Sequence, residues 1–503
     1  MPSIFDKSTE DFNKLISDVL NEFKHSFSAI ASPTISKQET VTYLYSSIKN
    51  RSNDDKFFPF PWRSLFLFIP RMVKMFFNLC FFSIIFRVRS LPKDAIYFKT
   101  YVVPRCFDSK NLKDDYFREF TADLSLKENV VVGYTSHNFS LMNRFRLINK
   151  KSNHIASDGL LTLFDILNLF YNYLTTAFIQ IKKDYYLNDS NIKAAINNSL
   201  LIDYLDMRSF EAYIEKYKCK KLISFKIKSF VYIYENQSWE KVCCSIFKKN
   251  NIKLIGYQSS GFSSLFLNFF PTKKDMKQNP MPDIILTVGK IFSNYLIENG
   301  NYSIPIETFC ALRYSYANDG KKYLVSNPNK TIFKRILYAF PVQVYQYNTT
   351  TVTDLINIFS ESDVSVDLKF HPLYQTSDLK GVSKLPSNFS IVNDLNMDSL
   401  KDTYDCVLFN DNSFGIESLL KGVKSFQYSH NNGRVFDGRF HYFDLWNVNL
   451  SYEGLKEIHN QISKGQLDKS FDLDDVSDYI NLMYQPYNKS NIDKFLTIVN
   501  TLN

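Results

Sequence analysis

Short apolar runs alternate with segments of helical spacing from Asp94 onward. The predicted strands of this first stretch are AIYFKTYVV, NVVVGYT, KLISFKIKSFVYIYE, IKLIGYQ and DIILTV. Helices are predicted between and after them, around residues 160–181, 192–217, 239–249 and 292–299. Strands that alternate with helices predict a parallel sheet covered on both faces, so residues 93–315 are interpreted as one α/β domain.

The alternation restarts after a polar stretch at residues 316–330, which is interpreted as a linker. Strands are predicted at RILYAF, VSVDLKF, FSIVN, CVLFN and SFQYS, with helices near residues 353–360, 397–402 and 414–421. Residues 331–480 are therefore a second predicted α/β domain, and residues 481–503 a C-terminal helix that could pack back on the first. Two such domains imply a cleft between them, with ligands beyond the carboxyl ends of the strands.

Residues 1–92 follow a different pattern and are predicted to be an added helical region. Within its most apolar part, residues 57–91, Arg71 and Lys74 interrupt a run that would need about 20 apolar residues to span a membrane. Cations interleaved with aromatic residues are typical of a segment in the lipid headgroup layer, so 57–91 is interpreted as a basic amphipathic membrane-association segment. The alternative is a buried helical hairpin whose cations reach the domain rim.

Composition narrows the class of protein. The chain has 503 residues, of which 45% are hydrophobic and 22% charged, which excludes general disorder and favours two or three domains. Sixty Lys and Arg against 51 Asp and Glu give a net charge of +9, which favours an anionic partner: nucleic acid, acidic lipid or a phosphorylated donor. Seven cysteines without a C-x-x-C spacing predict free thiols, and the polar start of the chain predicts a cytoplasmic protein.

Glu235 is the first candidate for chemistry, because it follows a strongly apolar predicted strand and precedes a helix containing Trp239. A carboxyl group presented at a strand end can take a proton from a sugar hydroxyl or, when ionised, attack an anomeric carbon. Residues 258–260 (Gln258, Ser259 and Ser260) end the next strand and offer hydrogen bonds to a substrate. The structural alternative is that Glu235 pairs with a lysine or caps the helix at Trp239.

Two further candidates lie in the second predicted domain. His371 and Pro372 end the run LKFHPLY, where an imidazole at a strand end could neutralise a phosphate, although a loop-capping histidine is the commoner outcome. In residues 406–429, Asn412 or Ser413 could cap a helix whose free amides attract phosphate, and Glu417 one turn later could bridge ribose hydroxyls. The alternative is an ordinary strand, turn and helix with a surface glutamate.

The motifs YENQSWEK, GYQSSGF, DIILTVG, KFHP and NSFGIESLLKG, spread over residues 220–430, resemble those of bacterial surface-polysaccharide glycosyltransferases that use CMP-activated ulosonic acids. The resemblance is to Kdo transferases of capsule and O-antigen synthesis and to their nonulosonic (sialic, pseudaminic or legionaminic) relatives. It implies an α/β fold of the GT-B type, in which two Rossmann-like domains face a cleft: 93–315 on the acceptor side and 331–480 holding the donor.

The resemblance also implies roles for individual residues. His371 would contact the CMP phosphate, Ser413 would lie near it, and Glu417 would approach the ribose or the base. Glu235 would take the acidic position of the donor-side or acceptor-side catalytic loop. Apart from the resemblance, His137 in GYTSHNFS is the next candidate base if Glu235 is structural. The chain departs from the pattern at Tyr234-Glu235-Asn236, which lacks the paired acids and glycine of many sialyltransferases, and at Asn412-Ser413, which is not a doublet of hydroxyl residues.

The sequence therefore predicts an enzyme, a cytoplasmic glycosyltransferase that moves a Kdo-like or nonulosonic acid from its CMP conjugate to a lipid-linked O-antigen or capsule glycan. No cofactor and no metal are expected, because CMP leaves as a single phosphate monoester whose charge a histidine and a helix N-terminus can carry. Peripheral association with the inner membrane is expected through 57–91, and nucleic acid is not an expected partner. The alternatives are a CDP-glycerol or CDP-ribitol phosphotransferase and, in another class, a non-catalytic membrane-associated scaffold or anion-binding protein.

Overall fold

The structure is a computed structural model in which two compact units can be described separately. Unit 1 comprises residues 1–260, 266–313 and 487–503, and unit 2 comprises residues 261–265 and 314–486. The described residues are 7–23, 26–37, 60–102, 106, 112–135, 140–148, 154–187, 190–262, 266–313, 331–340, 346–370, 385–392, 395–410, 412, 414–428, 450–469 and 473–501. The predicted linker at 316–330 lies outside them.

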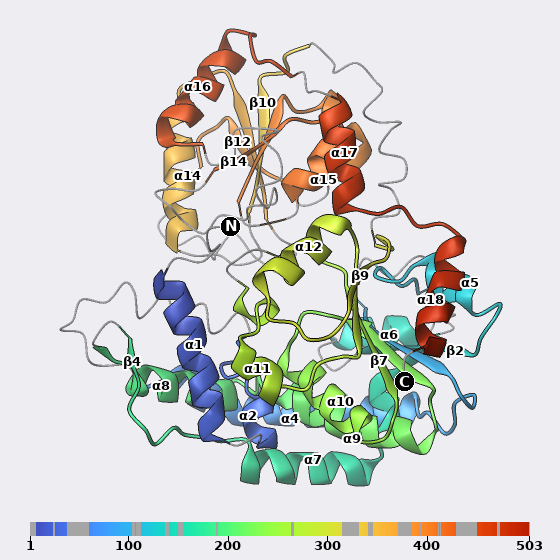
Figure 1. The fold of residues 1–503 in the computed structure, drawn as a ribbon. Coiled ribbons are helices and arrows are strands. Elements are labelled where there is room, and N and C mark those ends of the chain that lie inside the picture. Colours follow the sequence, from blue (N-terminus) through green and yellow to red (C-terminus); the bar gives the residue numbers. More distant parts are fainter. Residues whose placement is uncertain are drawn as a thin grey trace. The chain divides into compact units, whose positions relative to one another are not determined.

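Unit 1 is built on a seven-stranded sheet (Figure 1). Its strand order is β3-β2-β1-β6-β7-β8-β9, and every neighbouring pair is parallel. The strands are β1 (Ile96–Tyr101), β2 (Val130–Thr135), β3 (His154–Ala156), β6 (Ser229–Ile233), β7 (Lys253–Gln258), β8 (Ile284–Thr287) and β9 (Ile306–Thr308). The order reverses direction between β1 and β6, which is the topology of a Rossmann-like domain.

Side chains of β1 alternate between the two helical layers of unit 1. Phe98 packs against Phe120 of α5 (Glu119–Leu124) and Phe495 of α18 (Ser490–Thr501), with ring centroids 6.1 and 6.0 Å away. Lys99 points to the opposite layer, where it lies 3.4 Å from Glu211 in α9 (Phe210–Ser224). This two-residue period fixes which face each layer covers, and the C-terminal helix α18 belongs to the α5 layer.

The layer formed by α9 and α10 (Ser238–Lys248) contains buried charges that are paired internally. Lys218 lies 2.7 Å from Asp158 and 3.0 Å from Glu215, and Glu215 lies 3.4 Å from Lys99. Burial disfavours the charge on Glu215, but the two lysines outweigh it and hold its pKa below the usual range. Buried charges persist only when they are compensated in this way, so Lys99 is committed to the interior.

Unit 2 contains a five-stranded parallel sheet in the order β12-β11-β10-β13-β14. The strands are β10 (Arg335–Ala339), β11 (Ser365–Lys369), β12 (Phe389–Ile391), β13 (Cys406–Phe409) and β14 (Ser425–Gln427). The order again reverses, here between β10 and β13. The predicted fold class, GT-B-like with two Rossmann-like α/β domains, is therefore confirmed at the level of the two sheets, while a shared cleft stays a prediction.

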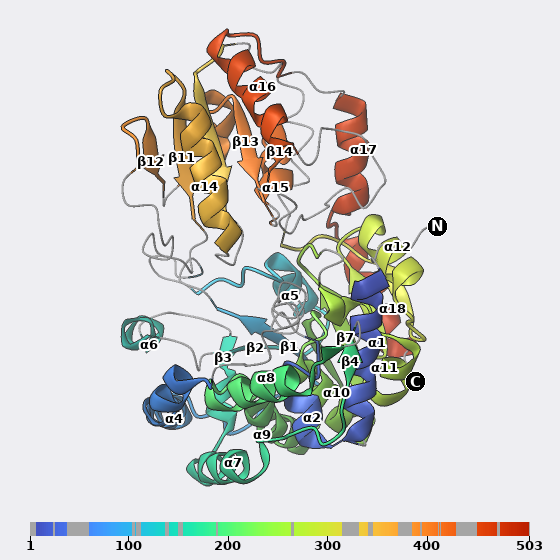
Figure 2. The ribbon, with the colours of Figure 1, turned by 90° about the vertical axis from the view of Figure 1, so that its left-hand side faces the viewer.

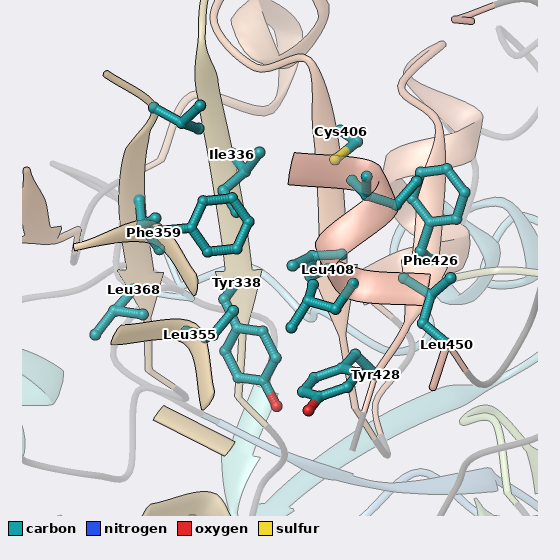
Figure 3. Packing of buried hydrophobic residues seen from close by; sticks show 14 of the residues in the cluster. Ile336, Tyr338, Leu355, Phe359, Leu368, Cys406, Leu408, Phe426, Tyr428 and Leu450 are labelled. Atoms are coloured by element: carbon teal, nitrogen blue, oxygen red, sulfur yellow. The ribbon is translucent and has the colours of Figure 1, made fainter. Parts of the chain in front are cut away.

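The faces of the second sheet again follow the two-residue period. Ile336, Tyr338 and Leu408 point into a core closed by Leu355 and Phe359 of α14 (Gln346–Phe359), as Figure 3 shows, and by the apolar face of α16 (Tyr452–Ser463). Leu337 and Val407 face the other way, toward the short helix η6 (Met397–Asp402) and α15 (Phe414–Leu420). The sheet is buried on both sides, as expected of parallel strands.

The N-terminal helices are part of unit 1. Helix α1 (Lys7–Glu22) packs on α11 (Lys273–Gln278), and α2 (Phe27–Ala31) packs on α9 and α10. Behind α2, the buried Lys37 donates hydrogen bonds to Asn13 (2.6 Å) and Ser17 (2.8 Å) and pairs with Asp275 at 2.5 Å. Burial disfavours the charge on Asp275, but Lys37 and the Thr272 amide lower its pKa.

Helix α4 (Trp62–Ile85) occupies most of the predicted membrane-association segment. It is a single helix of 24 residues with Pro70 inside it, so the alternative of a buried helical hairpin is wrong. One face packs on η2 (Ser157–Leu160), α7 (Leu163–Thr176) and α8 (Lys193–Leu205). Among the described residues, it is the helix with the length and composition to cross a membrane, and 28% of its most apolar 18-residue window is buried.

Two element predictions need correction. The helix predicted at 192–217 is two helices, α8 and α9, because Met207 adopts a left-handed φ of 56° that breaks the chain's helical path. The strand predicted from Lys221 begins only at Ser229, since residues 221–224 complete α9, whose two sides are both buried and therefore lack a clear period.

The remaining elements complete the units. In unit 1 they are α6 (Leu141–Ile148), β4 (Tyr186–Leu187), β5 (Ser190–Asn191), η3 (Leu267–Phe269) and α12 (Lys290–Asn299); in unit 2, α17 (Leu473–Met483). Strands β4 and β5 form a small antiparallel hairpin. All seven cysteines, at 80, 106, 219, 243, 244, 310 and 406, are free thiols, as predicted.

Lys37 provides a test of how firmly the N-terminal region is held. Lys37→Ala should lower the free energy of unfolding by about 3 kcal/mol, because it leaves the Asp275 carboxylate buried without its cation. Urea unfolding followed by circular dichroism measures the change. Lys14→Ala, which removes the exposed partner of Glu10 in α1, is the control and should unfold like the wild type. Equal stability of all three proteins would contradict the assignment.

Candidate functional site

The point where the first sheet reverses its strand order lies between β1 and β6. In sheets of this topology, the loops that leave the carboxyl ends on either side of that point diverge and leave a crevice for ligands. Glu235 follows β6 by two residues and therefore lies at this edge. The adjacent strand β7 pairs Tyr257 with Ile233, which brings residues 258–260 to the same edge. Glu235 and residues 258–260, which are the predicted site residues of unit 1 that the structure describes, therefore lie at the same edge of the sheet.

The loop that carries Glu235 is tied down on two sides. The backbone amides of Glu235, Asn236 and Gln237 donate to the Glu240 carboxylate at 3.0, 2.9 and 3.0 Å. The Asn236 side chain donates to the Asn268 carbonyl at 2.6 Å, and the Asn268 side chain returns a hydrogen bond to the Glu235 carbonyl. Asn236 has a φ of 52°, a conformation that asparagine tolerates better than most residues.

Glu240, and not Glu235, is the acid at the start of α10. Glu240 is buried and forms a capping box with Gln237, so the alternative in which Glu235 caps this helix is wrong. Burial and the nearby charge of Glu235 raise the pKa of Glu240 well above its usual value, against the backbone hydrogen bonds that favour its ionised form. The Glu235 carboxylate is half-buried and accepts a hydrogen bond from the Gln237 side chain.

Aromatic rings surround the edge next to Glu235. Trp239 donates to the Gln237 amide oxygen at 2.9 Å, and its ring lies 6.3 Å from that of Tyr101, the last residue of β1. Burial, followed by the charges of Glu211 and Glu235, raises the pKa of Tyr101 well above its usual value. The Tyr101 hydroxyl is therefore protonated at neutral pH and remains a hydrogen-bond donor.

The three residues after β7 differ in their accessibility. Gln258 is fully buried, donates to the Ser260 carbonyl and accepts from the Val288 amide at 3.4 Å. Ser259 is also fully buried, and its hydroxyl has no hydrogen-bond partner among the residues that the structure describes. Ser260 is half-buried. Gln258 thus shapes the loop from inside, and direct substrate contact by the three residues stays a prediction.

Arg313 is a cation at this edge that the sequence did not single out. Its guanidinium donates to the Ser260 hydroxyl at 3.4 Å and lies 5.2 Å from the centroid of the Tyr116 ring. It follows β9 by five residues in a stretch without a recognisable motif, so only the fold shows that it reaches β7. A half-buried guanidinium can bind a carboxylate or phosphate oxygen with two parallel hydrogen bonds.

In unit 2, Asn412 lies where the second sheet reverses its order. Its side-chain amide donates to the carbonyl of Ala339, the last residue of β10, at 2.9 Å and to that of Asn410 at 2.7 Å. Its oxygen accepts the Phe414 amide at 2.9 Å, which starts α15. The prediction that Asn412 or Ser413 caps this helix is therefore confirmed for Asn412, which also joins the ends of β10 and β13.

Two more polar side chains of unit 2 belong to elements at this edge, one on α15 and one at the end of β14. Glu417 is half-buried on α15, one turn after the cap, as its spacing predicted. Gln427, the last residue of β14, is fully buried, and neither atom of its amide group has a hydrogen-bond partner among the described residues. A buried amide without partners is costly, so a polar group that reached it would stabilise this edge.

Four predicted site residues lie outside the described residues: His137, His371, Pro372 and Ser413. Their roles stay predictions. Within the described part of the chain, no three His, Cys, Asp or Glu side chains gather in a way that could hold a metal ion.

Comparisons with known proteins find similar solved structures, all at low sequence identity. No family model matches the chain, and no curated protein matches it. Among solved structures, UDP-N-acetylglucosamine 2-epimerase from Rickettsia bellii is similar with a TM-score of 0.46 and 11% identity, covering 81% of this chain and 98% of its own. UGT89C1 of Arabidopsis thaliana complexed with UDP has a TM-score of 0.46 and 10% identity, covering 81% and 100%.

A third structure, UDP-GlcNAc 2-epimerase from Neisseria meningitidis bound to UDP-GlcNAc, has a TM-score of 0.43 and 10% identity and covers 81% of this chain and 100% of its own. At these values the likeness assigns neither a family nor a substrate to this chain.

The Glu240 carboxylate gives a test of how the candidate catalytic loop is held. Glu240→Ala should lower the free energy of unfolding by about 2 kcal/mol, because three backbone amides, one buried and two partly buried, lose their acceptor. Glu240→Gln keeps one acceptor oxygen and should lose less. Urea unfolding measures both, with Glu453→Ala in the exposed first turn of α16 as the control. An alanine variant as stable as the control would show that the carboxylate does not hold the loop.

Proposed function

We propose that this chain is a glycosyltransferase that moves a Kdo-like or nonulosonic acid from its CMP conjugate to a hydroxyl of a lipid-linked glycan. The observation that carries the proposal is the position of Glu235, whose carboxylate stands at the strand-order reversal of unit 1 on a loop fixed by Glu240 and Asn268. A catalytic carboxylate needs this combination of a rigid backbone and a place at the ligand edge.

Glu235 would act on the acceptor in this scheme. As a general base, it would take the proton from the attacking hydroxyl while the sugar leaves CMP. The Tyr101 hydroxyl could donate a hydrogen bond to the same substrate, since it stays protonated at neutral pH. Arg313 would be suited to the carboxylate that every ulosonic acid carries, because a guanidinium matches the two oxygens of a carboxylate.

Donor binding is assigned to unit 2. Asn412 fixes the turn between β13 and α15, and Glu417 lies in the first turn of that helix, where it would contact a ribose. His371, Pro372 and Ser413 would complete the phosphate contacts in the same proposal. The charge that develops on CMP would then be carried by protein groups, so the proposal includes activity without a divalent metal.

A donor panel tests the assignment as a whole. The purified chain is expected to release CMP from a CMP-ulosonic acid in the presence of a glycan acceptor, with the product identified by its mass, and to keep this activity in excess EDTA. UDP- and TDP-sugars are expected to give no product. Transfer from CDP-glycerol or CDP-ribitol would replace the proposal by phosphotransfer, while dependence on a metal would refute only the metal-free part.

Glu235→Gln isolates the chemical step. The turnover number should fall by roughly 10²-fold or more, because the amide cannot accept the proton, while the affinity for CMP measured by calorimetry stays unchanged. Glu128→Gln is the matched control, since Glu128 is a half-buried glutamate at the opposite, amino end of the sheet, where it pairs with Lys228 at 3.4 Å. Normal turnover of Glu235→Gln would show that this carboxylate is structural.

A further inference from the structure

The outward face of α4 is an uninterrupted apolar stripe. Its members recur at helical spacing along the whole length of the helix, and all are exposed: Trp62, Phe66, Ile69, Val73, Phe77 and Ile84. Phe66, with 75% of its surface exposed, is the most exposed of the six. Soluble proteins rarely leave a stripe of large apolar side chains of this length in water, so this face is expected to be covered in the working state.

Helix α7 carries a second apolar stripe. Its inward residues are buried, but Phe164, Leu167, Tyr171 and Leu174 point outward, and Phe164 is 72% exposed. Their spacing of three and four residues places them on one side of the helix. An amphipathic helix normally turns its apolar side inward, whereas α7 is apolar on both sides.

The two stripes belong to one surface. Phe76 of α4 and Phe170 of α7 pack edge to face with centroids 5.5 Å apart, so the helices touch. At the other flank, Arg144 of α6 lies 5.7 Å from the Phe81 ring of α4, and α6 adds the exposed Met142, Phe145 and Ile148. Figure 2 shows α6, α4 and α7 along one edge of unit 1. We call this edge the α4–α6–α7 surface.

Its charge is of one sign. Residues 57–91 and helix α6 contain no acidic residue, and the single acid of α7, Asp165, is engaged in the capping box with Thr162. Five cations on the helices and just after α4 are exposed, and none forms an ion pair with a described residue: Arg63, Lys74, Arg87, Arg89 and Arg146. Arg63 and Lys74 each follow a stripe residue directly, about 100° around the helix, where a long side chain can reach headgroups.

Helix α4 is held along the body of unit 1. Arg71 pairs with Asp206, the Ser83 hydroxyl donates to the Leu161 carbonyl at 2.6 Å, and the Val88 amide donates to the Gly159 carbonyl at 2.9 Å. A Cβ on Gly159 would come within 2.1 Å of the Phe86 carbonyl oxygen, so the end of α4 is seated against this backbone. To cross a bilayer, α4 would have to break these contacts and expose its buried face.

We propose that the α4–α6–α7 surface docks unit 1 onto an anionic lipid bilayer, with the apolar stripes in the headgroup layer and without a membrane-spanning segment. A second copy of the chain fits the surface less well, because a two-fold contact would bring two positively charged surfaces face to face. Anionic headgroups supply the missing counter-charges, and each cation near the bilayer surface adds to the attraction. The inference does not rest on the transfer chemistry, since binding needs no donor.

Vesicle flotation of the full chain tests the surface. The wild type should float with vesicles of equimolar phosphatidylcholine and phosphatidylglycerol, bind less to phosphatidylcholine alone, and be released by alkaline carbonate. The double variant Phe164→Glu/Leu167→Glu should lose roughly tenfold or more of its partition, because two apolar side chains leave the layer and two charges replace them. Lys74→Gln/Arg146→Gln should weaken binding severalfold on the anionic vesicles only.

The matched control is Leu126→Glu/Ile297→Glu, which adds the same charge at exposed apolar positions of unit 1 outside these helices, 86% and 56% exposed. It should bind like the wild type, and circular dichroism should show all three double variants folded. Wild-type flotation of the α7 variant would overturn the proposal. Vesicle binding that resists alkaline carbonate would also overturn it, because it would indicate a membrane-spanning helix. The same holds if the chain does not bind vesicles but is a dimer that the α7 substitutions convert to a monomer, since a second copy would then cover the surface.

Discussion

The parallel pairing of β1 with β6 is the constraint on which the rest of unit 1 depends. It places Ile96 opposite Ser229 and Lys99 opposite Tyr232, so both strands end at one level and the chain must leave them in diverging directions. The inner strands pair on both sides, and helices cover both faces, so the carboxyl edge is the expected place for side chains that serve a ligand. Glu235 stands there because β6 ends two residues before it.

The strands could be predicted from the sequence to a useful degree, because apolar runs bounded by polar turns identify buried parallel strands. Their order in each sheet is known only from the structure. The break at Met207 could not, since apolar residues fill both sides of the surrounding helices and leave no period. The choice of Glu240 over Glu235 as the capping acid depends on the left-handed Asn236, a backbone detail without a pattern. Arg313 joins the site only through the fold.

Buried and exposed cations of unit 1 differ in whether carboxylates neutralise them. Lys37, Lys99 and Lys218 are buried, and each is matched by carboxylates within 3.4 Å. These three matched lysines therefore add little to the net charge of +9. Exposed cations gather instead beside the stripes of α4 and on α6. The sequence total does not reveal this separation, because paired and unpaired lysines count alike.

The position of α6 would connect the α4–α6–α7 surface with the edge of the sheet that carries Glu235. Strand β2 ends at Thr135, on the same carboxyl edge as Glu235, and only residues 136–140 lie between it and α6. If a bilayer contacted the exposed face of α6, only these five residues of chain would separate the bilayer-bound helix from the strand that ends at this edge. An acceptor carried on a lipid would keep its reactive sugar near this edge by tethering alone, so weak contacts between protein and glycan would suffice for capture.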